Sequence, residues 1–239
     1  MYFDPSGYNE KSPKPPRAVY AVDDTEEAIK DALEKAKRKM YVANANDGFA
    51  MLVGDENKDV RSLLEKYGLK GIWYKNKRPD FTPVALFNVK IDNMTNSRKG
   101  DGGTYAQTKE KIAEQLIKAN GDFDRLMKEN VIKKEATLET QRILKEFLKE
   151  KIKPILDSNS KENTKIRKIR GAIRKLQTGK KYTIHEVDAK SSICQLVPTE
   201  INKRFDHAGG VSDSGGTRRE TEKEENNKKE EKGKNCSVT

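Results

Sequence analysis

One segment of the sequence reads Tyr182-Thr-Ile-His-Glu-Val-Asp188 and continues, after a short polar turn, as Ile193-Cys-Gln-Leu-Val-Pro198 and Thr199-Glu-Ile-Asn-Lys-Arg-Phe-Asp-His-Ala-Gly-Gly210. The first two parts are short and rich in β-branched residues, so they predict a β-hairpin. Thr199 is a suitable N-cap for a helix after Pro198, and Gly209 is suited to end that helix. The segment therefore predicts a β-β-α unit.

Both histidines of the chain, His185 and His207, fall within this unit. Phosphodiester hydrolysis needs a base that activates water and a cation that stabilises charge on the phosphate. A histidine on a strand can supply the base, while a helix that faces it supplies metal ligands and an orienting amide. A lone histidine in a strand is usually a structural residue, but two histidines in one small unit favour a nuclease site that includes Asn202.

Asn202 and His207 are five residues apart. This spacing does not place two side chains on one face of a regular helix. Both can point inward only if the helix ends or tightens near His207, and the pair Gly209 and Gly210 favours such an end.

These residues resemble the HNH/endonuclease VII superfamily with the ββα-metal fold, in particular toxin nucleases. The matching elements read Tyr182-Thr-Ile-His-Glu186, Gln195-Leu-Val-Pro198 and His207-Ala-Gly-Gly210. The resemblance implies a metal-dependent endonuclease in which His185 is the general base. It also implies that His207 ligates one divalent ion, magnesium or zinc, and that Asn202 orients His185 or completes the metal shell.

Three positions depart from the pattern of these nucleases. Ile184 stands where tryptophan is usual, Glu186 where a second histidine is usual, and Asn202 where the helix carries a histidine. In a regular strand the Glu186 side chain points away from His185. Glu186 is therefore a metal ligand only if the strand ends or twists there, and Asp188 is a weaker candidate.

The chain carries a formal net charge of +11, with 36% charged and 33% hydrophobic residues. Such an excess of positive charge favours a polyanionic partner, either nucleic acid or an acidic protein. Much of it lies in residues 163–177, where one helical face is apolar and the other is basic. A basic face beside a nuclease-like unit indicates contacts with backbone phosphates. The candidate phosphate contacts are Lys203, Arg204, Arg170, Arg174, Lys175, Lys180 and Lys181.

The rest of the chain predicts an α+β protein with a small N-terminal α/β region and a helical middle. Expected strands are residues 18–22, 41–45, 49–53, 72–74 and 84–91, and expected helices are residues 25–39, 59–67, 105–119, 135–152 (ending before Pro154) and 163–177. The expected parts are a lead-in (1–17), an α+β region (18–100), a helical region with a basic face (101–178), the nuclease core (179–216) and a charged, disordered tail (217–239).

A second resemblance lies in Tyr2-Phe-Asp-Pro-Ser-Gly-Tyr8, which is similar to the Asp-Pro-x-Gly junction that closes the cage of Rhs and YD-repeat proteins. By itself Asp-Pro-Ser-Gly is only a turn. Together with a toxin-type nuclease segment it implies a secreted bacterial effector that acts in the cytoplasm of a target cell. The implied partners are the parent Rhs cage and a dedicated immunity protein, and the positive charge predicts that this protein is acidic.

The two cysteines, Cys194 and Cys236, cannot form a disulfide framework or a four-thiolate zinc site. No apolar run reaches the ~20 residues that span a bilayer, so no membrane-spanning segment is expected. DNA is the expected substrate. An RNase with the same site is one alternative. The other is a non-catalytic nucleic-acid-binding protein, which the departure at Glu186 supports.

Overall fold

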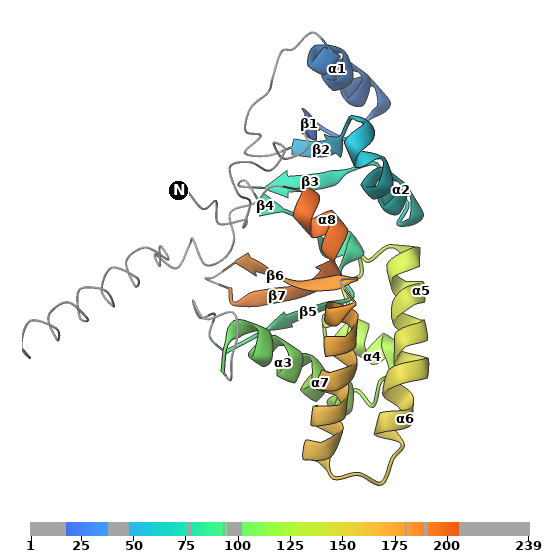
Figure 1. Ribbon diagram of the computed structural model, residues 1–239, viewed down its shortest axis with the longest axis vertical. Helices are drawn as coiled ribbons and strands as arrows, with labels where there is room; N and C mark the ends of the chain where they lie inside the picture. Colours follow the sequence, from blue (N-terminus) through green and yellow to red (C-terminus); the bar gives the residue numbers. More distant parts are fainter. Residues whose placement is uncertain are drawn as a thin grey trace, which may run out of the picture.

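The computed structural model describes residues 18–37, 48–75, 78–92, 94, 102–179, 181–188 and 191–205. Within these ranges the chain forms helices and two small antiparallel sheets (Figure 1). The predicted α+β class is thereby confirmed. The predicted lead-in 1–17, strand 41–45 and tail 217–239 lie outside the described residues.

The first sheet has four strands in the order β1-β2-β3-β4. They are β1 (Ala18–Ala21), β2 (Gly48–Leu52), β3 (Ile72–Lys75) and β4 (Arg78–Pro79). Two helices accompany this sheet, α1 (Glu26–Lys37) and α2 (Lys58–Lys66). The Thr25 hydroxyl accepts a hydrogen bond from the Ala28 amide (3.3 Å), so Thr25 caps α1.

The second sheet has three strands in the order β5-β7-β6. They are β5 (Phe87–Lys90), β7 (Ile193–Pro198) and β6 (Tyr182–Asp188). The predicted strand 84–91 is shorter than expected, because Val84 belongs to the 3-10 helix η2 (Thr82–Val84). Since β5 pairs with β7, the predicted segments 18–100 and 179–216 share one sheet.

The helical middle contains one helix that the sequence did not predict, α4 (Phe123–Lys128), whose first turn is capped by Asp122. The others are α3 (Thr104–Lys118), α5 (Leu138–Phe147), α6 (Lys153–Leu156) and α7 (Glu162–Thr178). A π-helical turn, η3 (Leu148–Ile152), joins α5 to α6. The predicted end before Pro154 is wrong, because Pro154 occupies the first turn of α6, where no backbone donor is required.

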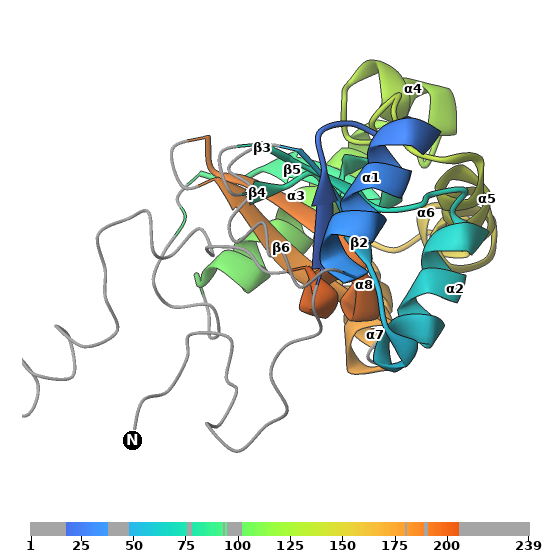
Figure 2. The same cartoon turned by 90° about the horizontal axis from the view of Figure 1, so that it is seen from above.

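Two of the three hydrophobic core clusters of the described residues meet at the second sheet. One cluster contains Phe87, Leu196 and Ile184 and continues into α3, α5 and α7. The other contains Val197 and joins it to α2, to the first sheet and to α8 (Thr199–Arg204). The helix α8 therefore packs between the two sheets and beside α2 (Figures 1 and 2). None of the described helices is long and apolar enough to cross a membrane.

Candidate nuclease site

The β6 strand presents its side chains alternately to the two faces of the second sheet. His185 lies on the face that α8 covers, with its ring edge-on to Phe81 at 4.9 Å between centroids. Phe81 packs in turn against Phe205, directly after α8, at 6.4 Å. We call this side the α8 face and the other side, which α3 and α7 cover, the α3 face. The His185 side chain is 4% exposed.

A row of polar side chains crosses the sheet on the α8 face. In the strand register Asn88 of β5 is opposite Gln195 of β7, and Gln195 is opposite His185 of β6. Gln195 Nε2 donates to Asn88 Oδ1 (3.3 Å) and to Thr82 Oγ1 (3.2 Å). Neither Asn88 nor Thr82 was expected at the site, because only the pairing of β5 with β7 brings them there.

The helix α8 supplies the second predicted catalytic residue, Asn202, and contacts both β6 and β7. Asn202 Oδ1 and Thr199 Oγ1 are buried, and neither has a hydrogen-bond partner in the described ranges. Residues three apart lie on one side of a helix, so these two oxygens share a side of α8. A buried carbonyl oxygen without a donor fits the oxygen ligands that hard divalent cations prefer.

Thr199 does not have the capping role that the sequence predicted. It is the first residue of α8, Pro198 occupies the N-cap position, and no side chain caps this helix. The Thr199 amide instead donates to the Lys181 carbonyl (3.0 Å), so the start of α8 is tied to the start of β6.

The helix α8 is shorter than the sequence predicted. The helix ends at Arg204, and Phe205 has extended backbone angles and is buried. The helix therefore ends earlier than the sequence predicted, before Gly209 and Gly210, which were expected to stop it. His207 itself and the predicted phosphate contact Lys180 lie outside the described residues.

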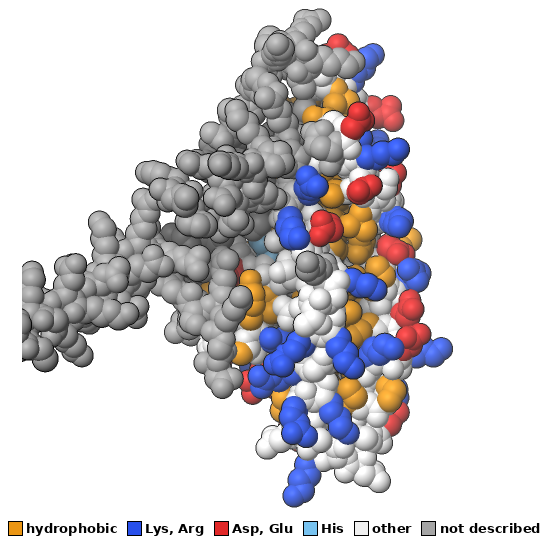
Figure 3. All heavy atoms as spheres, viewed as in Figure 1, with side chains coloured by type: hydrophobic (Ala, Val, Ile, Leu, Met, Phe, Trp, Pro, Cys, Tyr) orange, Lys and Arg blue, Asp and Glu red, His pale blue; other side chains and the backbone are white. Residues whose placement is uncertain are grey.

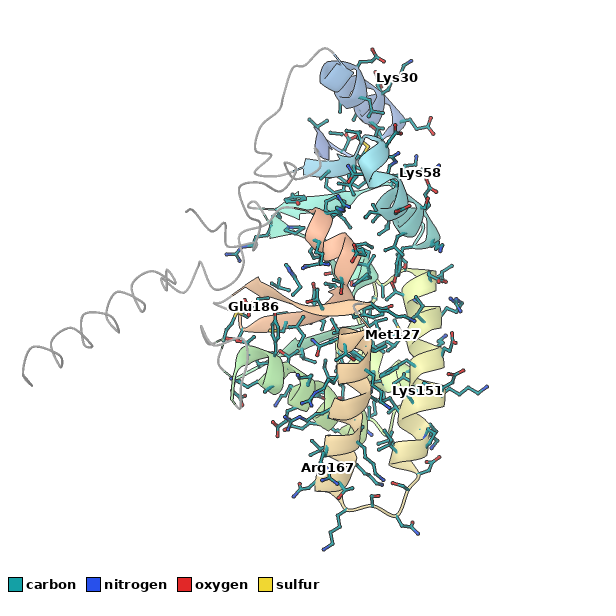
Figure 4. The ribbon with its side chains drawn as sticks, in the orientation of Figure 1. Lys30, Lys58, Met127, Lys151, Arg167 and Glu186 are labelled. Atoms are coloured by element: carbon teal, nitrogen blue, oxygen red, sulfur yellow. The ribbon has the colours of Figure 1, made fainter. Side chains whose placement is uncertain are left out.

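Glu186 (labelled in Figure 4) follows His185 on β6, so strand alternation places it on the α3 face. It is buried and opposite Cys194 in the register. Burial raises the pKa of the Cys194 thiol to about 11; a hydrogen bond with Thr108 lowers it, and the nearby Glu186 charge raises it further. A bulge between Glu186 and Asp188 places Asp188 opposite Ile193. The structure does not bring Glu186 to His185, so we leave it out of the proposed ligand set.

The predicted phosphate contacts separate into two groups. Arg170, Arg174 and Lys175 lie on α7, which packs against α3 and β6 on the α3 face. Lys203 and Arg204 lie on α8, where Lys203 Nζ pairs with Glu200 Oε1 (3.4 Å). Basic side chains gather on the lower part of the molecule, over α7 (Figure 3). The exposed Lys181 connects α7 to β6.

No family model matches this chain, and the comparisons with curated proteins and with solved structures gave no match. Within the ranges that the structure describes, no three His, Cys, Asp or Glu side chains lie close enough together to hold a metal ion. Of the three predicted residues of the HNH site, His185 and Asn202 lie in the described ranges and His207 lies outside them.

Proposed function

We propose that this protein is a metal-dependent endonuclease of the HNH type, with a ββα-metal unit that hydrolyses phosphodiester bonds in DNA. One observation supports this most directly. His185 and Asn202 lie on β6 and α8, two elements in contact, and the Asn202 Oδ1 atom is buried without a donor in the described ranges. Such an oxygen is suited to a ligand that the protein alone does not provide.

In this proposal His185 takes a proton from the attacking water. Phe81 holds the imidazole by its edge contact, and the Gln195 amide, fixed by Asn88 and Thr82, keeps the neighbouring strand in register. Asn202 Oδ1 and His207 would hold a magnesium or zinc ion. When bound, the ion would stabilise negative charge on the phosphate and the leaving oxygen.

The burial of His185 sets a condition on this mechanism. The side chain is 4% exposed and packs against Phe81, which packs against Phe205. A phosphate reaches the imidazole only if this cover moves when substrate binds. The same burial supports the rival function, a non-catalytic nucleic-acid-binding protein. In that case His185 is a core residue, because a buried histidine packed on an aromatic ring needs no catalytic role.

The biological setting is proposed from the sequence resemblance. The protein would be the toxin region of a Rhs-type effector, delivered into the cytoplasm of a target cell and neutralised by an acidic immunity protein. The α8 and α7 cations would hold substrate phosphates in the free toxin and would be covered in the complex. Complex formation should therefore weaken steeply with added salt.

Plasmid nicking across magnesium, manganese and zinc, with EDTA as the negative control, tests the activity. Nicking by the wild type that His185→Ala lacks would support the proposal. Salt-dependent plasmid binding without nicking in any of the three metals would instead establish the non-catalytic rival. A parallel incubation with total RNA separates a DNase from an RNase that uses the same site.

A further inference from the structure

The helix α7 carries an unbalanced set of charges. Its acidic residue is Glu162, in the first turn. Its basic residues are Lys165, Arg167, Lys168, Arg170, Arg174 and Lys175. Two of these have local roles, since Lys165 Nζ donates to the Leu156 carbonyl (2.6 Å) and Lys168 Nζ to Ser160 (3.1 Å). The three arginines project from the remaining surface.

The packing of α3 against α7 adds a lysine that the sequence gave no reason to select. Lys109 is half-buried, and burial lowers its pKa, as do the charges of Arg174 and Arg170. Arg170 Nη1 pairs with Glu110 Oε2 at 3.7 Å, whereas Lys109 and Arg174 form no ion pair within the described ranges. Within the described ranges, Arg170 is thus the one cation of these three that is paired with a carboxylate.

Several other cations of the helical region are paired with nearby acidic residues. Lys111 pairs with Glu114 (3.2 Å) and Lys118 with Glu129 (3.5 Å). Arg142 pairs with Glu139 at 2.8 Å. Crowding of unpaired positive charge is unfavourable in the free protein. A surface that keeps several unpaired positive charges close together is suited to bind an anionic ligand.

We propose that Lys109, Arg170 and Arg174, here named the α3–α7 cluster, bind the phosphate backbone of the duplex on which the proposed nuclease acts. This inference rests on the proposed function. The helix geometry supports a polymer over a single anion. Arg167 (labelled in Figure 4) is followed by Arg170 and Arg174 at intervals of three and four residues, so the three form one stripe along α7.

The length of this arginine stripe matches the spacing of several phosphates along one strand of a nucleic acid. From Arg167 to Arg174 the helix advances about 10 Å. Duplex DNA advances about 3.4 Å per nucleotide of one strand, so the stripe covers about three nucleotides. Since α7 lies on the α3 face and His185 on the α8 face, the substrate passes the edge strand β6 between the binding cations and the base.

The test measures binding without cleavage. A His185→Ala protein in EDTA is titrated with a labelled 30-base-pair duplex at several salt concentrations. The cluster variant adds Lys109→Met, Arg170→Gln and Arg174→Gln. The control variant adds Lys111→Met, Lys118→Met and Arg142→Gln, which removes the same net charge from paired positions. Circular dichroism and thermal unfolding of each variant establish that it is folded.

Each backbone phosphate contact contributes about 0.9 to the slope of log affinity against log salt. We expect the cluster variant to lose about 3 units of slope and on the order of 100-fold in affinity at 0.15 M salt, while the control variant changes little. Equal losses in the two variants would reduce the effect to net charge and overturn the inference. So would polyglutamate that binds more tightly than the duplex and depends on the same residues, because the occupant would then be an acidic protein.

The proposed nuclease function and the proposed α3–α7 cluster are contradicted by different outcomes of this test. A His185→Ala protein that does not bind the duplex at all contradicts the proposed function as well as the cluster. A protein that binds normally after the three cluster substitutions contradicts only the cluster.

Discussion

The two faces of the second sheet differ in what their buried polar groups can do. On the α8 face His185 and Gln195 form a row with Asn88, and α8 adds the Asn202 amide oxygen. On the α3 face Glu186 is opposite Cys194 beneath α3, and the cations lie beyond it on α7. His185 and Glu186 are adjacent in sequence but thus have different surroundings. His185 contacts Phe81 on the α8 face, and Glu186 lies opposite Cys194 on the α3 face.

The sharpest test of this difference compares the two adjacent residues. His185→Ala should lower plasmid nicking by roughly 10²–10⁴-fold, which is the usual contribution of a general base. Glu186→Gln should leave the nicking rate unchanged, because its side chain is on the α3 face. Initial rates at saturating metal measure both. A Glu186→Gln protein as inactive as His185→Ala would show that the faces are not functionally separate.

The sequence predicted the α8 face well where local pattern decides the structure. The hairpin of residues 182–198, the following helix and the alternation that separates His185 from Glu186 all follow from residue type and spacing. Asn88, Thr82 and Lys109 were missed, because their roles depend on contacts between segments distant in sequence. Gln195 reaches Thr82 and Asn88 across 113 and 107 residues, respectively.

The errors in the predicted elements have local physical reasons. The helix through Pro154 continues because a π-helical turn precedes it and leaves the proline in a first turn. Thr199 is not a cap because α8 begins at Thr199 itself, with Pro198 at the N-cap position. The residue preferences of proline and threonine alone predict an earlier helix end and a capping threonine, and the local backbone geometry differs at both positions.

Substitution of Asn202 should affect metal-dependent activity and the stability of the fold differently. Asn202→Ala should raise the metal concentration needed for half-maximal nicking by roughly tenfold or more. It should leave the free energy of unfolding unchanged or raise it by about 1 kcal/mol, because the substitution removes a buried oxygen that has no donor in the described ranges. Metal titrations and urea unfolding measure the two effects. A clear loss of stability would identify Asn202 as a structural residue.

Substitution of Gln195 tests whether the polar row of Asn88, Gln195 and His185 stabilises the protein. Gln195→Ala removes two hydrogen bonds from a side chain that is 3% exposed. Loss of a buried hydrogen-bonding group should lower the free energy of unfolding by about 1–3 kcal/mol. Gln141→Ala, which removes one hydrogen bond from a half-buried side chain on α5, is the matched control and should cost less. Equal losses would mean that the row contributes nothing beyond an ordinary hydrogen bond.

The smallest effect is expected at Cys194 on the α3 face. Its folded-state pKa of about 11 exceeds the ordinary value, so the thiol stabilises the fold at neutral pH and this contribution is lost as pH rises through 9 to 11. Cys194→Ala should flatten the fall of unfolding free energy over this range. Urea unfolding between pH 8 and pH 11 measures the difference. In the native protein at pH 8, alkylation of Cys194, followed by peptide mapping, should be slow.

The pairing of β5 with β7 has a consequence for the order in which the chain assembles. β7 pairs with β5, a strand that was translated about a hundred residues earlier, so the sheet cannot form until nearly the whole described chain has emerged. Contacts this distant in sequence slow folding, because a long loop must close before they are made. During synthesis β5 therefore gains its partner strand in this sheet only after residues 193–198 have been made.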